Sequence, residues 1–300
     1  MSDSYPVFEI TPEWVLEPEG MGSKEKFWYR EREGAPDWLF KFPQPNTGQH
    51  WAEKIAAEVA DCLGIRHARV ELAVFQGTRG SSSESFAGDR RDLYHGNQIL
   101  AGQVLDYQPA KRFKQSDHTL ENIFTALERS FSTKEGAQRA KRDMVDYLVL
   151  DAVIGNTDRH HENWGILRRR VGDRWQGVLA PSFDHASSLG RELADTSDGK
   201  CRIRFLGEGR VGVYAEKAPG AIYWSREDRK GLSPLALVRR ATEKHPDLFR
   251  LALGRLERLS RPRLQEIVTQ IPTDWISPVA QEFAVELMCY TLNELRHVQP

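Results

Sequence analysis

The hydrophobic pattern of this chain is mainly strand-like in its first part and mainly helical in its second, and this change limits the folds that the chain can adopt. Residues 14–42 hold aromatic and β-branched clusters separated by glycines and prolines, which predicts a small antiparallel sheet. Residues 49–63 place apolar side chains at helical spacing and are followed by Gly64, a residue suited to a helix end. The chain therefore begins as strands with one helix.

Three segments complete this first part. Residues 69–76 alternate between apolar and polar side chains, which predicts a further strand. Residues 77–92, GTRGSSSESFAGDRRD, have no periodicity and indicate an exposed loop; its serines are candidate phosphorylation sites, although a surface loop without that role is the simpler interpretation. Residues 97–109 return to strand or extended character before Pro109.

Helical patterns dominate the second part. Residues 118–131 form one amphipathic segment, and residues 137–155 form another that ends at a glycine. Residues 164–180 contain two short strands around a basic turn and predict a hairpin. Residues 234–296 predict several more helices interrupted by prolines.

Together these patterns predict an α+β fold with two lobes. We expect a small β-rich lobe over residues 1–107 and a mostly helical lobe over residues 108–300, with a cleft between them. A chain of 300 residues is long enough to bury a core of this kind.

The composition excludes several classes of protein. Lys and Arg number 42 against 43 Asp and Glu, so no bulk charge attracts nucleic acid or an anionic membrane, and we expect no direct nucleic-acid binding. The three cysteines are far apart and suit neither a zinc site nor a redox pair. The N-terminus lacks a signal-peptide pattern, and no apolar run is long enough for a membrane span. We therefore expect a cytoplasmic protein.

A polar run follows the second helical segment directly. Residues 151–167, DAVIGNTDRHHENWGIL, concentrate acids, histidines and asparagines where the apolar pattern ends. The expected hairpin would return the later segment PSFDHASSLG beside this run, so that Asp158, Asn163 and Asp184 could converge. Two carboxylates and an amide oxygen suit a hard divalent ion such as Mg²⁺.

The first part of the chain holds groups that could complete a site for phosphoryl transfer from ATP. Lys41 lies between apolar residues in WLFKF, and Glu53 or Glu58 on the following helix could pair with it. The glycine turn EGMGSKEKF would bring backbone N–H groups close to phosphate oxygens. Each feature alone is typical of an ordinary edge strand, helix face or turn, but their order along the chain favours a nucleotide site.

These residues resemble a known family. GNTDRHHEN followed by FDHASSLG resembles the catalytic loop and metal-binding segment of the HipA-like serine/threonine kinases, and the DRHxxN core is also similar to that of the phosphoinositide kinases. The segments WLFKFP, AEKIAAEVADCLGI and LYHGNQIL are similar to the first lobe of compact HipA-like kinases. The resemblance extends from about Gly20 to about Gly190 and implies a two-lobed, protein-kinase-like fold.

The resemblance also implies roles for individual residues. Asp158 would be the catalytic acid or base, while Asn163 and Asp184 would bind Mg²⁺. Lys41 would hold the ATP phosphates and Glu53, preferred here to Glu58, would orient it.

Two further parts of the nucleotide site are implied by the resemblance. The phosphate loop would contain Gly22 and Ser23, where Ser23 is the nearest counterpart of the serine that this family autophosphorylates. The hinge to adenine would run through Gln103, Val104 and Leu105.

The family resemblance implies a kinase that acts on Ser or Thr of a protein substrate, with a possible antitoxin partner or a role as a secreted effector without a classical signal peptide. A lipid or small-molecule kinase of phosphoinositide-kinase type is the alternative within the same chemistry. A third hypothesis is a metal-dependent phosphohydrolase that uses His160, His161 and His185. The order Asp184 then His185 is the reverse of what that site would need.

Overall fold

The computed structural model describes residues 4–18, 25–88, 91–196 and 201–298. Within them, the first lobe is a six-stranded sheet in the order β1-β5-β6-β4-β3-β2, with one helix, α1 (Gln49–Leu63), packed against β5 and β6. β1 runs parallel to β5, and the other neighbours are antiparallel. The strand bounds are Val7–Ile10, Val15–Pro18, Lys26–Tyr29, Trp38–Lys41, Val70–Phe75 and Thr78–Glu84 for β1 to β6.

The expectation of an exposed loop over residues 77–92 was wrong for its first half. β6 (Thr78–Glu84) is an inner strand paired with β5 on one side and β4 on the other, and the side chains of Ser81 and Ser82 are buried. Serine and glycine give no apolar periodicity, so the strand forms because its neighbours supply hydrogen bonds on both sides. The small residues also fit a crowded face, since a Cβ on Gly80 would lie 2.4 Å from the ring of Phe40.

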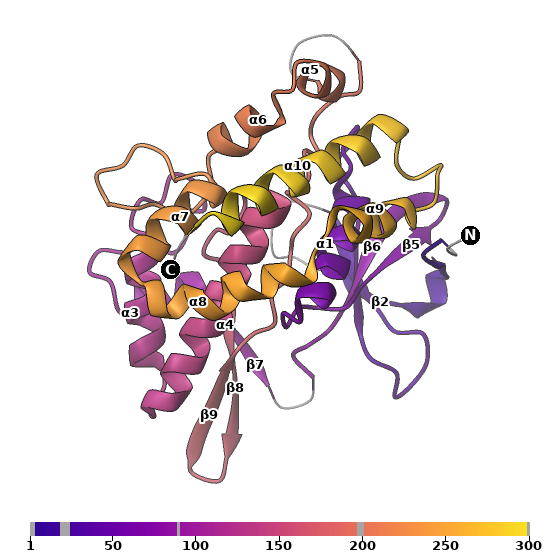
Figure 1. The fold of residues 1–300 in the computed structure, drawn as a ribbon. Coiled ribbons are helices and arrows are strands. Elements are labelled where there is room, and N and C mark those ends of the chain that lie inside the picture. Colours follow the sequence, from indigo (N-terminus) through magenta and orange to yellow (C-terminus); the bar gives the residue numbers. More distant parts are fainter. Residues whose placement is uncertain (1–3, 19–24, 89–90, 197–200, 299–300) are drawn as a thin grey trace.

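A second sheet joins distant segments. β7 (Asp92–His95) pairs with β8 (Gly165–Val171), and β8 pairs with β9 (Arg174–Leu179), so the predicted hairpin is confirmed. Figure 1 shows this hairpin projecting away from the helices.

The prediction of strand or extended structure over residues 97–109 was wrong. The chain instead forms α2 (Gly96–Ala101) followed by turns, and α2 packs against α3 (Leu120–Ser130) and β8. The side chain of Gln98 accepts a hydrogen bond of 2.9 Å from the N–H of His95, which stabilises the first turn of α2. Residues 92–101 thus pack with the helical part.

The helical lobe surrounds α4 (Lys134–Ile154), which contacts α3, α7, α8 and α10. Serine N-caps and prolines in the first turn begin α7, α9 and α10, so these prolines start helices rather than interrupt them. Tyr147, Phe249 and Phe283 are fully buried in the core that results. The remaining bounds are Arg202–Gly207, Val211–Lys217, Pro234–Lys244, Pro246–Gly254, Arg261–Thr269 and Pro278–Arg296 for α5 to α10.

The last helices return to the first lobe. Figure 1 shows α9 beside α1, and the N–H of Tyr5 donates a 2.7 Å hydrogen bond to the carbonyl of Gln270 just after α9. Across the described ranges, no helix is both long and apolar enough to cross a membrane.

Candidate active site

Lys41 lies at the end of β4 with its side chain only 11% exposed. Its Nζ is 3.3 Å from both carboxylate oxygens of Glu53 and 3.3 Å from Oδ1 of Asp184. Burial alone would lower the pKa of Lys41, but the carboxylates of Asp184 and Glu53 together outweigh burial and raise it above its ordinary value. The lysine therefore stays cationic at neutral pH.

Glu53 and Glu58 occupy different faces of α1. Five positions along a helix turn the side chain by about 140°, so only one of the two can face Lys41. Glu53 is 1% exposed and contacts Lys41, whereas Glu58 forms a 2.7 Å ion pair with Lys54. The structure thus brings Glu53 to the lysine, and Lys54 holds Glu58 elsewhere.

The loop after α4 begins at Gly155, whose φ of 64° ends the helix in the left-handed conformation. Five residues beyond Asp158, the Nδ2 of Asn163 donates a 2.7 Å hydrogen bond to the backbone carbonyl of Asp158. This bond closes the loop and leaves the amide oxygen of Asn163 as the end that can act as a ligand. Asn163 is 4% exposed and lines a cavity between the lobes.

Arg159 holds this loop together from inside the protein. Its guanidinium donates to both oxygens of Asp151 at 2.7 and 2.8 Å, to the carbonyl of Asn163 at 2.8 Å and to Oγ of Ser182 at 2.9 Å. These contacts join the end of α4, the loop and the segment that precedes Asp184. Arg159 is 3% exposed, so its guanidinium is enclosed by these partners.

Asp184 adopts a backbone conformation that is uncommon for residues other than glycine. Its φ is 58°, and its side chain remains 25% exposed beside Lys41. The next residue, His185, supports this turn. Its N–H donates to Oε1 of Glu53 at 3.1 Å, and the imidazole ring of His185 contacts Oγ of Ser182 at 2.6 Å. Strain held by the surrounding structure is common at functional sites.

The cavity that contains these groups has a volume of about 480 Å³. Lys41, Asn163 and Asp184 line it, and so does the chain from Ser83 to Ala87, which leads out of β6. A pocket of this size that is largely apolar with a few converging polar groups is typical of small-molecule and cofactor sites. Residues 83–87 were not predicted to line a site, because the sequence pattern indicated a surface loop there.

The residues expected at the hinge lie elsewhere. Gln103, Val104 and Leu105 do not line the cavity: the side chain of Gln103 donates to Oγ of Ser130 at 3.1 Å, and Leu105 is 81% exposed. They follow α2, which carries the chain away from the first lobe. Gly22 and Ser23, expected in the phosphate loop, lie outside the described residues.

Asp158 lies beside the cavity rather than on its wall. It lines a neighbouring cavity of about 260 Å³ together with His160 and Tyr223. Its Oδ2 accepts a hydrogen bond of 3.4 Å from Oγ of Ser187. Of the residues predicted from sequence, the structure therefore brings Lys41, Glu53, Asn163 and Asp184 together and places Asp158 next to them.

The histidines already have protein partners. Nε2 of His160 accepts from Arg112 at 3.1 Å, Nδ1 of His161 contacts the hydroxyl of Tyr107 at 2.7 Å, and His185 contacts Ser182. Burial lowers the pKa of His160 to about 3 and that of His161 to about 4, with the charge of Arg112 adding to both. Among the described residues, no group of three or more His, Cys, Asp or Glu side chains is arranged to hold a metal ion. These contacts do not support a histidine-based metal site.

Comparison with known proteins agrees with this geometry. The model of the HipA-like C-terminal domain matches residues 19–271. This chain belongs to the HipA-like family. A sequence relative, the serine/threonine-protein kinase CtkA of Helicobacter pylori, is 23% identical over 160 residues, or 51% of this chain. The match spans only about half of that relative, 46% of its length.

Solved structures show the fold. The crystal structure of the Helicobacter pylori proinflammatory kinase CtkA has a TM-score of 0.76 at 18% identity, covering 97% of each chain. HipA of Shewanella oneidensis, in a complex with HipB and operator DNA, has a TM-score of 0.60 at 15% identity over 97% of this chain and 69% of that one. The predicted α+β, kinase-like fold is confirmed.

Proposed function

We propose that this HipA-like chain is a protein kinase that transfers the γ-phosphoryl group of ATP to a Ser or Thr hydroxyl with the help of Mg²⁺. One observation carries the proposal: Lys41 is held between Glu53 and Asp184 at the wall of a cavity that also contains Asn163. A fixed cation beside two oxygen ligands is what the phosphates of a nucleotide require.

The nucleotide would occupy the 480 Å³ cavity. Lys41 binds the phosphates, and Glu53 keeps its Nζ in place. The base would lie against Leu39 and Leu93, and the chain at Phe86 and Ala87, just after β6, would meet the adenine edge in place of the residues expected from sequence.

Mg²⁺ fits the oxygen donors that are present. The carboxylate of Asp184 and the amide oxygen of Asn163 are hard ligands on one cavity wall, and Mg²⁺ takes few protein ligands because it keeps several waters and phosphate oxygens. When bound, the ion would neutralise charge on the phosphates.

Asp158 acts on the acceptor. Its carboxylate orients the hydroxyl and takes its proton as the hydroxyl oxygen bonds to the γ-phosphorus. The bond from that phosphorus to the bridging oxygen breaks, and ADP leaves. Ser187 positions the carboxylate through its hydrogen bond to Oδ2.

Calorimetric titration of ATP, with and without Mg²⁺, tests the proposal on the wild type, Asp184→Ala and Asp158→Asn. We expect Asp184→Ala to lose the Mg²⁺-dependent part of binding. Asp158→Asn should still bind nucleotide in this titration, but its rate of phosphoryl transfer should fall by a factor of about 100 or more. Asp173→Ala, at the fully exposed tip of the hairpin, is the control and should match the wild type. A wild type that does not bind ATP would refute the proposal.

A further inference from the structure

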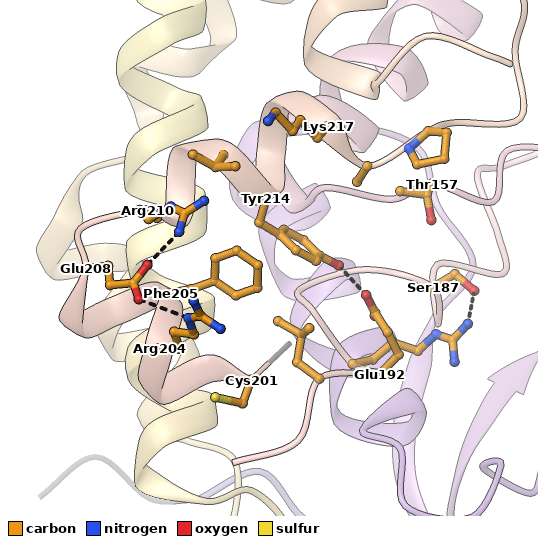
Figure 2. Close-up of a pocket in the computed structure, with 15 residues that line it drawn as sticks. Thr157, Ser187, Glu192, Cys201, Arg204, Phe205, Glu208, Arg210, Tyr214 and Lys217 are labelled. Atoms are coloured by element: carbon orange, nitrogen blue, oxygen red, sulfur yellow. Dashed lines mark hydrogen bonds and ion pairs between the residues drawn. The ribbon is translucent and has the colours of Figure 1, made fainter. Parts of the chain in front are cut away.

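A third cavity, of about 790 Å³, opens beside the loop that carries Asp158. It lies between residues 187–193 and the two short helices α5 and α6 (Figure 2). Thr157 and Ser187 lie on one side of it, and Arg204, Glu208 and Arg210 lie on the other. The nucleotide proposal makes no use of this space.

Hydrogen bonds connect this cavity to Asp158. Ser187 donates to Oδ2 of Asp158 at 3.4 Å, and the guanidinium of Arg191 donates to Oγ of Ser187 at 3.1 Å. Thr157, which also lines the cavity, precedes Asp158 in the chain. Asp158 itself lines the cavity of about 260 Å³, which shares Thr157 and Pro219 with this one, so a polypeptide bound here can extend to the carboxylate that takes the acceptor proton.

The charge of the cavity wall is positive. Among the described residues, four cationic side chains line it against two acidic ones, which leaves an excess of two positive charges. Glu208 accepts hydrogen bonds from Arg204 at 2.9 Å and from Arg210 at 2.7 Å, so these three side chains together keep one net positive charge. The other acid, Glu192, accepts a hydrogen bond of 2.8 Å from the hydroxyl of Tyr214 across the cavity (Figure 2).

Two cations remain available to a ligand. Lys217, at the end of α6, forms no ion pair within the described ranges. Arg191 donates to Ser187, but its Nε is buried without a hydrogen-bond partner. An unsatisfied buried donor is costly, and a turn of the Arg191 side chain that brings this Nε to an anionic ligand would remove that cost.

Part of the wall is apolar. Leu193, Phe205, Val213 and the ring of Tyr214 line the cavity between the cations. An inorganic anion would leave this surface uncovered, whereas a polypeptide segment with acidic and apolar side chains would cover both parts of the wall. The cavity is also larger than the one proposed for the nucleotide, at about 790 against 480 Å³.

We propose that this cavity binds the acceptor polypeptide and selects a Ser or Thr that is flanked by Asp or Glu. The inference rests on the kinase function proposed above and adds the class of substrate. Lys217 and Arg191 are its specificity-determining cations.

Two fluorescein-labelled synthetic peptides provide the test. Both peptides contain the same Ser, Thr and apolar residues. The Ser and Thr are flanked by Asp and Glu in one peptide and by Lys and Arg in the other. Fluorescence polarisation measures binding to the wild type, to Lys217→Glu and to Lys134→Glu, an exposed lysine at the start of α4 and far from the cavity in sequence. Transfer from ATP to each peptide and calorimetric ATP binding are measured on the same proteins.

We expect the wild type to prefer the acidic peptide. Reversing the charge at Lys217 should raise the Kd and KM for that peptide by roughly fivefold to tenfold and leave ATP affinity unchanged. Lys217→Glu should also bind the basic peptide better than the wild type does, a gain that a misfolded variant cannot show. Lys134→Glu should behave as the wild type.

Three results would overturn the inference. The first is equal affinity of the wild type for both peptides, and the second is an equal effect of the two substitutions. The third is a Lys217→Glu variant that loses acidic-peptide binding without gaining affinity for the basic peptide. If ATP binding persists in those cases, the kinase proposal stands while the assignment of the acceptor cavity fails. Absence of ATP binding by the wild type would remove the kinase proposal itself and this inference with it.

Discussion

One carboxylate, that of Glu53, connects three parts of the site. It contacts Lys41 on β4 and accepts from the N–H of His185, the residue after Asp184. Its own position is fixed by α1, where it is 1% exposed. Removing its charge therefore weakens the restraint on the lysine and on the turn that presents Asp184, without changing the size of the side chain.

Glu53→Gln should lower kcat/KM for ATP by roughly tenfold or more, which corresponds to about 1.4 kcal/mol in the transition state. The physical reason is that Lys41 loses one of its two anionic partners. Glu58→Gln is the matched control, because Glu58 pairs with Lys54 on the same helix. Steady-state kinetics on both variants is the measurement. Equal losses in the two would indicate a general weakening of α1 instead of a contact with Lys41.

At the level of elements, the pairing of β4 with β6 positions Lys41. Lys41 lies opposite Ser81 in the register of these strands, and the adjoining Gly80 leaves room for the ring of Phe40. A Cβ at Gly80 would also lie 2.6 Å from the carbonyl oxygen of Lys41. The small residues of β6 are therefore required for the close approach that places the lysine at the cavity.

Gly80→Ala should lower the free energy of unfolding by about 1 to 3 kcal/mol, because the new methyl group overpacks the sheet. It should also weaken ATP binding, since the backbone of Lys41 must shift. Gly207→Ala, where a Cβ would meet nothing within 4 Å, is the control for the change of residue type. Urea unfolding and calorimetry give both readouts. Stability of Gly80→Ala equal to that of the wild type would show that the sheet relaxes freely.

For the molecule as a whole, buried histidines link stability to pH. Burial lowers the pKa of His118 and of His160 to about 3, and a positively charged arginine near each adds to the shift. The unfolded chain takes up these protons below its ordinary pKa of about 6.5, whereas the folded protein does not. The unfolded state thus binds more protons in this range, and the free energy of unfolding falls as pH decreases from about 6.5.

Urea unfolding between about pH 7 and pH 5 should show this decline, with each such histidine adding up to about 1.4 kcal/mol per pH unit. His160→Asn removes one titrating group and should flatten the slope by part of that amount. Arg112, Asp158 and Glu162 surround His160 and remain in the variant. A slope identical to that of the wild type would mean that His160 does not contribute.

Local sequence determined the elements whose signals are local. The helix ending at Gly64, the helix ending at Gly155 and the hairpin of β8 and β9 are confirmed, because periodicity and turn-forming residues act over a few positions. The polar run after Gly155 and the later segment PSFDHASSLG likewise predicted that Asn163 and Asp184 lie close together, and both line the same cavity.

Only the tertiary structure decided which distant segments meet. β6 is a strand because β4 and β5 pair with it, not because its serines favour one. The cavity proposed for the nucleotide is lined by residues 83–87 rather than by those after α2, since β7 pairs with β8, 70 to 76 residues further along the chain. Glu53 rather than Glu58 contacts Lys41 because the two glutamates lie on different faces of α1. Such choices depend on contacts between segments remote in sequence, which no local pattern encodes.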